Sequence, residues 1–116
     1  MDTRDAETRK GDTREGQVAV IFTSWRNGRD PAGYDAAAAA MEALAAAQPG
    51  YRGIDSARRP DGFGITVSYW DSDAAARAWR DQPDHAATRE AGRARWYDGY
   101  TVAVARVERD YRWTTP

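Results

Sequence analysis

The chain has 116 residues, with sixteen arginines against one lysine, no cysteine and a formal net charge of −1. This length is typical of a single domain, and the interspersed basic and acidic residues argue against a nucleic-acid partner. The absence of cysteine excludes a disulfide framework, a thiolate nucleophile and a cysteine metal site. No apolar run approaches the ~20 residues of a membrane span, so we expect a cytoplasmic protein with no membrane partner.

The first residues of the chain are strongly charged. Residues 1–16 contain four basic and five acidic side chains, and Met1 is the only large apolar residue among them. Such a segment buries too little apolar surface to offset its ordering entropy. We therefore predict a disordered tail over residues 1–16, a folded domain over residues 17–110 and a C-terminal tail over residues 111–116.

The stretch from Gln17 to Trp25 predicts a β-strand, because it is rich in β-branched and aromatic residues. In a strand, Val18, Val20 and Phe22 share one face, and the alternating residues form a second face that is also largely apolar. A strand that is apolar on both faces needs to be covered on both of them.

A helix is predicted after this strand. Asp30 is suited to cap it, with Pro31 at the first helical position, where the missing N–H costs nothing. We expect the helix to run to about Gln48, before a Pro-Gly pair that stops it. Its core-facing stripe at helical spacing consists of Tyr34, Met41 and Leu44.

The rest of the chain predicts three strands and two helical stretches. The strands are expected at residues 51–58, 63–70 and 97–110, and the helical stretches at residues 74–82 and 84–95. A Pro-Asp-Gly turn joins the first two strands into a hairpin, whereas Pro83 separates the two helical stretches. The residues suited to cap these stretches are Asp71, Ser72 and Asp73 for the first and Asp84 for the second.

The resulting order, β-α-β-β-α-β, predicts an α+β, ferredoxin-like fold with an antiparallel sheet and both helices on one face. The other face of such a sheet would expose Ala19, Ile21 and Trp25 or their opposite set. An apolar sheet face of that size is too large to leave in water, so we expect a homodimer in which two such faces pair.

Several segments resemble the antibiotic biosynthesis monooxygenase family of the dimeric α/β-barrel superfamily. The matching segments are VAVIFTSW near the start, PGYRGIDSAR after the first helix, GITVSYWDSDAAARAW across the third strand, and RWY at residues 95–97. Trp70 and Trp79, nine residues apart, are also spaced as in heme-degrading relatives. The resemblance implies a small dimeric barrel, with reactions that range from cofactor-free oxygenation to heme degradation.

His85 and Arg89 are the candidate catalytic residues. His85 is the only histidine, and its side chain is the one whose ordinary pKa lies near neutrality, so it is suited to move a proton. Arg89 follows at i+4 and shares its helix face, where the pair could hold an enolate or a carboxylate. The alternative interpretation is that His85 is a surface or helix-capping residue and that Arg89 belongs to a solvated, arginine-rich face.

A cleft between sheet and helix is the usual default for a small-molecule site, and aromatic residues cluster on both elements. Each of these residues could equally be ordinary core. The candidate residues for binding a small aromatic ligand are Thr23, Tyr69, Trp79, Trp96 and Tyr97.

Heme is the alternative cofactor that the resemblance implies, with His85 as the ligand. In the heme-degrading relatives the axial histidine would fall at the position of Arg89, one helical turn later. Their asparagine on the first strand has no clear equivalent here, and Thr23 or Ser24 stands nearest. One histidine and scattered carboxylates give no other metal site.

Three hypotheses follow. The first is a small dimeric monooxygenase that acts on an aromatic or polyketide-like molecule without a metal or flavin, by deprotonating a ring that then reacts with dioxygen. The second is a heme-binding or heme-degrading protein that uses His85. The third is a non-catalytic ligand-binding dimer in which every aromatic residue is core.

Overall fold

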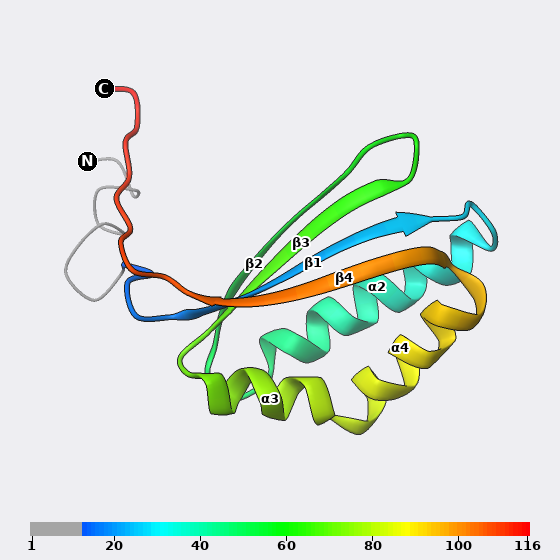
Figure 1. The fold of residues 1–116 in the computed structure, drawn as a ribbon, viewed down its shortest axis with the longest axis horizontal. Coiled ribbons are helices and arrows are strands. Elements are labelled where there is room, and N and C mark those ends of the chain that lie inside the picture. Colours follow the sequence, from blue (N-terminus) through cyan, green and yellow to red (C-terminus); the bar gives the residue numbers. More distant parts are fainter. Residues whose placement is uncertain (1–12) are drawn as a thin grey trace.

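The computed structural model describes residues 13–116, in which the elements follow the order β-α-β-β-α-α-β (Figure 1). The elements are β1 (Val18–Arg26), α2 (Pro31–Ala46), β2 (Tyr51–Arg58), β3 (Phe63–Trp70), α3 (Asp73–Asp81), α4 (Pro83–Arg95) and β4 (Tyr97–Arg106). The strands form one sheet in the order β2-β3-β1-β4, and every neighbouring pair is antiparallel. Figure 1 shows the three helices on the same side of this sheet. The predicted α+β, ferredoxin-like fold is therefore confirmed.

Local signals set the ends of the helices. Asp30 accepts a hydrogen bond from the Gly33 N–H and caps α2, as expected, although the helix ends at Ala46 rather than near residue 48. The cap of α3 is Ser72, whose side chain accepts from the Ala75 N–H. The cap of α4 is Gln82, so the prediction of Asp84 was wrong: it lies in the first turn instead. Pro83 at the first position forces this arrangement, since its ring fixes the backbone one residue before Asp84.

The β2–β3 hairpin is anchored to the end of β1. Asp61 accepts a hydrogen bond from the Phe63 N–H, and the Gly62 carbonyl accepts from the Arg26 N–H. Gly62 has a φ of +100°, and an added Cβ would lie 2.7 Å from the Arg26 carbonyl oxygen. Glycine is therefore required in this turn, both for its conformation and for the close approach.

The core lies between the sheet and the helices. Val18 and Trp70, paired across β1 and β3, pack against Ala45, Ala76 and Trp79 of the helices. Val20 packs against the same cluster, so the predicted inward face of β1 is confirmed. The small alanine side chains allow α2 and α3 to approach two indole rings closely.

The last strand is shorter than expected. β4 ends at Arg106, whereas the prediction extended it to residue 110, because after Val107 pairs with Gln17 no neighbouring strand remains to bond. Residues beyond it run away from the sheet, and Tyr111 and Trp113 are exposed (Figure 1).

The N-terminal segment meets this C-terminal extension. Of the predicted tail, residues 1–12 lie outside the described part of the chain. Thr13 and the Arg14 N–H both donate to the Asp110 carboxylate, and the Arg14 guanidinium lies 3.7 Å from the centre of the Tyr69 ring.

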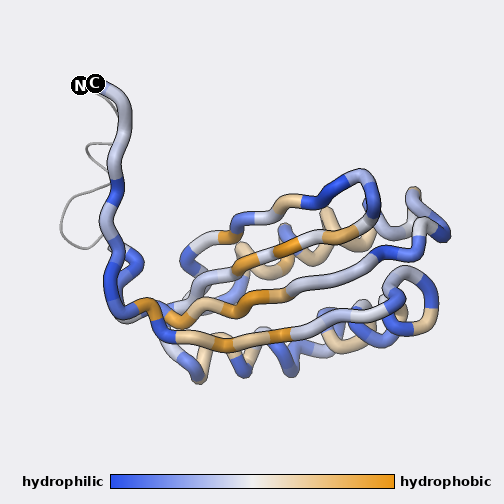
Figure 2. The backbone as a smooth tube through the Cα atoms, turned by 45° about the horizontal axis from the view of Figure 1, so that its top comes forward, coloured by the Kyte–Doolittle hydropathy of each residue, from blue (hydrophilic) through white to orange (hydrophobic). Residues whose placement is uncertain are grey.

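Hydrophobic residues recur along β1, β3 and β4 (Figure 2). The strand register places Ile21, Val67 and Ala103 together on the side of the sheet away from the helices, here called the outer face. Trp25 is 47% exposed and Ile65 is 41% exposed, and nothing in residues 13–116 packs over them as the helices pack over the inner face. None of the described helices is long and apolar enough to cross a membrane.

Candidate functional site

Two groups of side chains lie at opposite ends of the inner face. The first, the tryptophan end, consists of Tyr51, Trp70, Trp79 and His85. Trp70 and Trp79 stack with ring centres 6.0 Å apart, and Trp79 and His85 stack at 4.0 Å with their planes only 8° apart. Trp79 is 8% exposed, so it is part of the core and forms a platform for the imidazole.

The break between α3 and α4 fixes the position of His85. Its backbone N–H donates to the Gln82 side chain, and its Nδ1 lies 2.8 Å from the Trp79 carbonyl oxygen. Because a carbonyl only accepts, Nδ1 carries the proton and Nε2 is left unprotonated in the neutral ring.

The surroundings favour this neutral imidazole. Burial is the main cause that lowers the pKa of His85, and the positive charge of Arg89 lowers it further, while the hydrogen bond to Trp79 opposes both. At neutral pH the ring is therefore a proton acceptor at Nε2 rather than an imidazolium.

Arg89 acts at the junction of the two helices. Its Nη1 donates to the Arg80 carbonyl oxygen at 3.1 Å, close to the end of α3. This bond satisfies a carbonyl that α3 itself leaves without a helical partner. Arg89 also lies one turn after His85, as the sequence predicted, and its role toward a substrate stays a prediction.

The second group, the arginine end, lies where β1 ends and α2 begins. It consists of Ser24, Arg26, Tyr34 and Arg58. The Arg58 guanidinium donates to Ser24 at 2.9 Å, to the Tyr34 hydroxyl at 3.1 Å and to the Gly62 carbonyl. The Arg26 guanidinium stacks over the Tyr34 ring, 3.8 Å from its centre.

Aromatic rings continue from the arginine end along the inner face. Tyr34 meets Trp96 and Tyr97 edge-on, each at 5.9 Å, and Phe22 packs against Tyr97 and Tyr100. Burial is the main cause that raises the pKa of Tyr97, and Tyr34 raises it further. Tyr97 therefore stays a neutral phenol and is unsuited to act as a base.

The structure divides the predicted site residues into three places. Trp79, His85 and Arg89 come together around the α3–α4 junction. Trp96 and Tyr97 lie together beside Tyr34, at the other end of α4. Thr23 and Tyr69 lie on the outer face, where Thr23 pairs with Thr101 and Tyr69 with Arg14.

Sequence reasoning missed the polar members of the arginine end. Ser24 is 1% exposed and falls on the same strand face as Val18, Val20 and Phe22. A hydroxyl at an inward position needs a partner, so this alternation was the available signal. The partner, Arg58, is far away in the chain.

The helices leave part of β4 uncovered. Val104 pairs with Val20 and Val102 with Phe22, so both valines face the helix side. They are nevertheless 57% and 53% exposed, because α3 packs over β1 and β3, and α4 meets β4 nearer its start, where Arg93 donates to the Tyr100 hydroxyl. The inner face therefore keeps an apolar surface open beside the helix layer.

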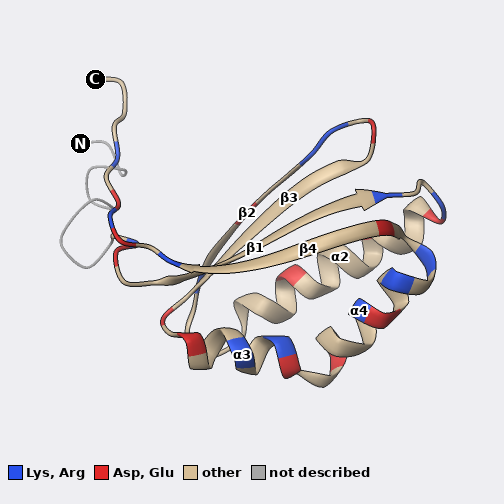
Figure 3. Ribbon diagram, viewed as in Figure 1, with Lys and Arg blue, Asp and Glu red and all other residues tan. Residues whose placement is uncertain are grey.

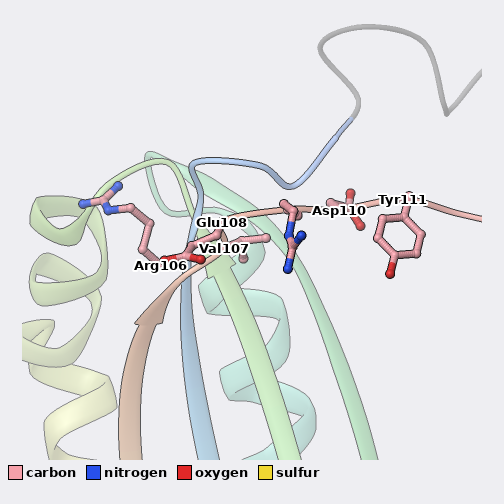
Figure 4. A pocket seen from close by; sticks show the side chains of 6 residues that line it. Arg106, Val107, Glu108, Asp110 and Tyr111 are labelled. Atoms are coloured by element: carbon pink, nitrogen blue, oxygen red, sulfur yellow. The ribbon is translucent and has the colours of Figure 1, made fainter.

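Two hollows of the described surface bear on the site. The larger, about 530 Å³, is lined by residues 106–111 alone (Figure 4). Because these residues are consecutive, it is a curve in one extended segment and not a cleft between elements. The other, about 370 Å³, lies at the arginine end. Within residues 13–116, no group of three or more His, Cys, Asp or Glu side chains is arranged to hold a metal ion.

Comparison with known proteins agrees with this architecture. The family model described as antibiotic biosynthesis monooxygenase matches residues 17–91. The uncharacterized protein YqjZ of Bacillus subtilis strain 168 is 50% identical over 91 residues, which cover 78% of this chain and 79% of that protein.

Solved structures show the same fold. SnoaB, a cofactor-independent oxygenase from Streptomyces nogalater, superimposes with a TM-score of 0.67 at 22% identity, over 87% of this chain and 98% of that one. Rv0793 from Mycobacterium tuberculosis superimposes with a TM-score of 0.68 at 21% identity, over 77% and 92% of the two chains. The resemblance seen in the sequence is confirmed, and the chain belongs to the antibiotic biosynthesis monooxygenase family.

Proposed function

We propose that the protein is a small homodimeric monooxygenase that acts on an aromatic or polyketide-like molecule without a metal or flavin. Its family and the fold that it shares with a cofactor-independent oxygenase support this reaction class. The observation that carries the proposal is the neutral His85, held flat on buried Trp79 with Nε2 free to accept a proton.

The chemistry requires one good proton acceptor and an electron-rich substrate. His85 Nε2 removes a proton from a CH₂ group that is activated by an adjoining ring and carbonyl. The carbanion adds to dioxygen, the second C–H proton is lost, and the O–O bond breaks. One oxygen atom becomes a ketone and the other leaves as water, so the four electrons from the carbon reduce one O₂.

Other side chains of the inner face have supporting roles in this proposal. Trp79 orients the imidazole, since Trp70 and His85 both stack on its ring. The substrate ring lies on the open apolar surface of β4, where Val102 and Val104 are exposed on the helix side. A flat hydrocarbon ring buries apolar area well on such a surface.

Oxygen consumption with a hydroxylated anthrone tests the proposal. The purified protein is expected to accelerate oxygen uptake and to form the corresponding quinone. The matched control is the 10,10-dimethyl anthrone, which has the same ring system but no proton to lose at the reacting carbon. Equal uptake with both compounds, or no uptake with a panel of anthrones, contradicts this function.

Heme binding is the second candidate, and one observation favours it. A metal-ligating histidine usually donates its other ring N–H to a carbonyl, as His85 Nδ1 does to Trp79. His85 would hold the heme iron through Nε2, and the heme would supply redox chemistry there. Adding hemin should then shift the Soret band, and His85→Ala should abolish the shift. An unchanged hemin spectrum with the wild-type protein removes this candidate.

The outer face supports the homodimer. Trp25, Phe63 and Ile65 lie on it with exposed apolar surface, and Thr101 and Ala103 of β4 extend the same surface. Burying two such faces against each other removes this area from water. Sedimentation at micromolar concentration should show a dimer, and a monomer under these conditions contradicts the pairing.

A further inference from the structure

The hollow of about 370 Å³ at the arginine end lies between two loops. One loop connects β1 to α2, and the other is the β2–β3 turn, so residues far apart in the chain form its wall. Its volume is at the lower limit of small-molecule sites. About eight residues of β1, roughly 26 Å at the usual rise per residue, separate it from the tryptophan end. It is therefore a separate place from the proposed oxygenase site.

The charge of its wall is strongly unbalanced. Arg26, Arg58 and Arg59 line it, whereas Asp61 is the one acidic residue in the wall. Both oxygens of Asp61 are already bound to Arg59, at 3.1 and 2.7 Å. Figure 3 shows the basic ends of β1 and β2 at this end of the sheet. Two guanidinium charges thus face the hollow without a carboxylate to balance them.

Arg58 is fixed in place and still has donors to offer. Its three hydrogen bonds go to uncharged acceptors, namely Ser24, Tyr34 and the Gly62 carbonyl. A guanidinium has five N–H donors, so two remain. Because Ser24 is buried and Gly62 is anchored to β1, the side chain is held in one position before any ligand arrives.

Arg26 has more unused hydrogen-bond donors than Arg58. Its guanidinium stacks on Tyr34 and makes neither a hydrogen bond nor an ion pair with any residue of the described chain. Stacking leaves the edges of the planar group free, and these edges match the two oxygens of a carboxylate or phosphate.

We propose that this hollow binds a small molecule through an oxyanion, a carboxylate or a phosphate group, which Arg26 and Arg58 hold together. The site works independently of His85 and goes beyond the oxygenase activity. Arg59 is already paired with Asp61, so it forms part of the wall and adds to the positive potential of the hollow without contacting the anion directly.

Calorimetric titration of the full-length protein tests the site with two probes, benzoate and inorganic phosphate. Saturable binding of either probe supports the site, and the preferred probe identifies the group. Neutral benzamide, the isostere of benzoate, is expected not to bind. Arg26→Gln should weaken binding by roughly 10- to 100-fold, since a charge-assisted pair is lost. Arg29→Gln, in the same loop but outside the wall, is the matched control and should bind as the wild type does.

A second measurement needs no variant. When the wild-type protein is titrated with whichever of the two anions binds, the NMR resonances of the Arg26 and Arg58 Nε groups should shift. The Nε resonance of Arg77 should stay unchanged. The proposal is overturned if neither anion gives saturable heat. It is also overturned if Arg26→Gln and Arg29→Gln weaken binding equally, because the effect would then be a diffuse field and not a site. Since these assays measure binding, they are unaffected by a failure of the oxygenase proposal.

Discussion

The tryptophan end and the arginine end are built from the same sheet and the same helix layer, yet they differ in chemistry. At the tryptophan end Trp70, Trp79 and His85 stack in sequence, and burial favours the neutral form of the His85 imidazole. At the arginine end the rings meet edge-on and share their surroundings with two guanidinium groups. Aromatic content alone therefore does not say what a region of this fold can do.

Small residues and polar anchors account for the difference. Ala45 and Ala76 let α2 and α3 approach Trp70 and Trp79, which buries the two indole rings and leaves His85 partly buried beside them. At the arginine end Ser24 stands where β1 would otherwise place an apolar side chain, and it brings Arg58 inward. A partly buried position shifts the pKa of a single titratable group, whereas a region with fixed donors is suited to hold an anion.

The largest effect is expected from His85→Ala. If Nε2 accepts the substrate proton, turnover of an anthrone should fall by roughly 10²- to 10⁴-fold, the usual contribution of general acid–base catalysis. Stability should change little, since the ring packs on one face of Trp79 only. Initial rates of oxygen uptake measure the effect, with Arg77→Ala on the exposed side of α3 as control. Full activity of His85→Ala would remove the histidine from the mechanism.

Trp79→Ala should give the largest loss of stability. The indole is buried between Trp70 and His85, and its removal should cost roughly 3–5 kcal/mol of unfolding free energy. Urea denaturation at one fixed protomer concentration measures this loss. Trp113→Ala removes an equal side chain from an exposed position and should change stability by less than about 0.5 kcal/mol. Similar losses for both variants would contradict the closed packing described for the tryptophan end.

The sequence predicted the fold better than it predicted the separation of the inner face into a tryptophan end and an arginine end. The strands at residues 51–58 and 63–70 were located to the residue, because the Pro-Asp-Gly turn between them admits a single hairpin arrangement. Asp84 as a cap was wrong, since Pro83 shifted the start of α4 by one position.

The candidate site depended on tertiary contacts that no local pattern contains. Arg58 reaches Ser24 only because β3 lies between β1 and β2, which brings residues from different strands around one hollow. Likewise Thr23 and Tyr69 alternate to the outer face once the pairing register is set. Residue type identified aromatic candidates, whereas strand order decided which of them meet.

Two matched tyrosine variants sharpen the comparison between the ends. Tyr34→Phe removes a hydroxyl that accepts from Arg58 and should cost about 0.5–1.5 kcal/mol. Tyr51→Phe at the tryptophan end should be nearly neutral, since that hydroxyl makes no hydrogen bond in the described chain and its ring still packs on Trp70. Tyr34→Phe should also bring the pKa of Tyr97 down toward its ordinary value, although burial keeps it raised. Phenolate absorbance follows this change, and an unaltered Tyr97 titration would contradict the coupling.

The smallest expected effect is a pH dependence that belongs to the tryptophan end. Burial lowers the pKa of His85 in the folded protein, so below its ordinary pKa the unfolded chain binds a proton that the folded chain resists. Stability from this residue is thus fully present above that ordinary pKa, near 6.5, and is lost as the pH falls toward the lowered folded pKa. Urea midpoints of the wild type should decrease between neutral and mildly acidic pH more steeply than those of His85→Ala. Arg89 adds to the effect by repelling the imidazolium, so Arg89→Gln should flatten the slope in part. Equal slopes in all three proteins would show that the imidazole titrates as it does in water, and the histidine would then lack the partial burial that favours a proton acceptor at neutral pH.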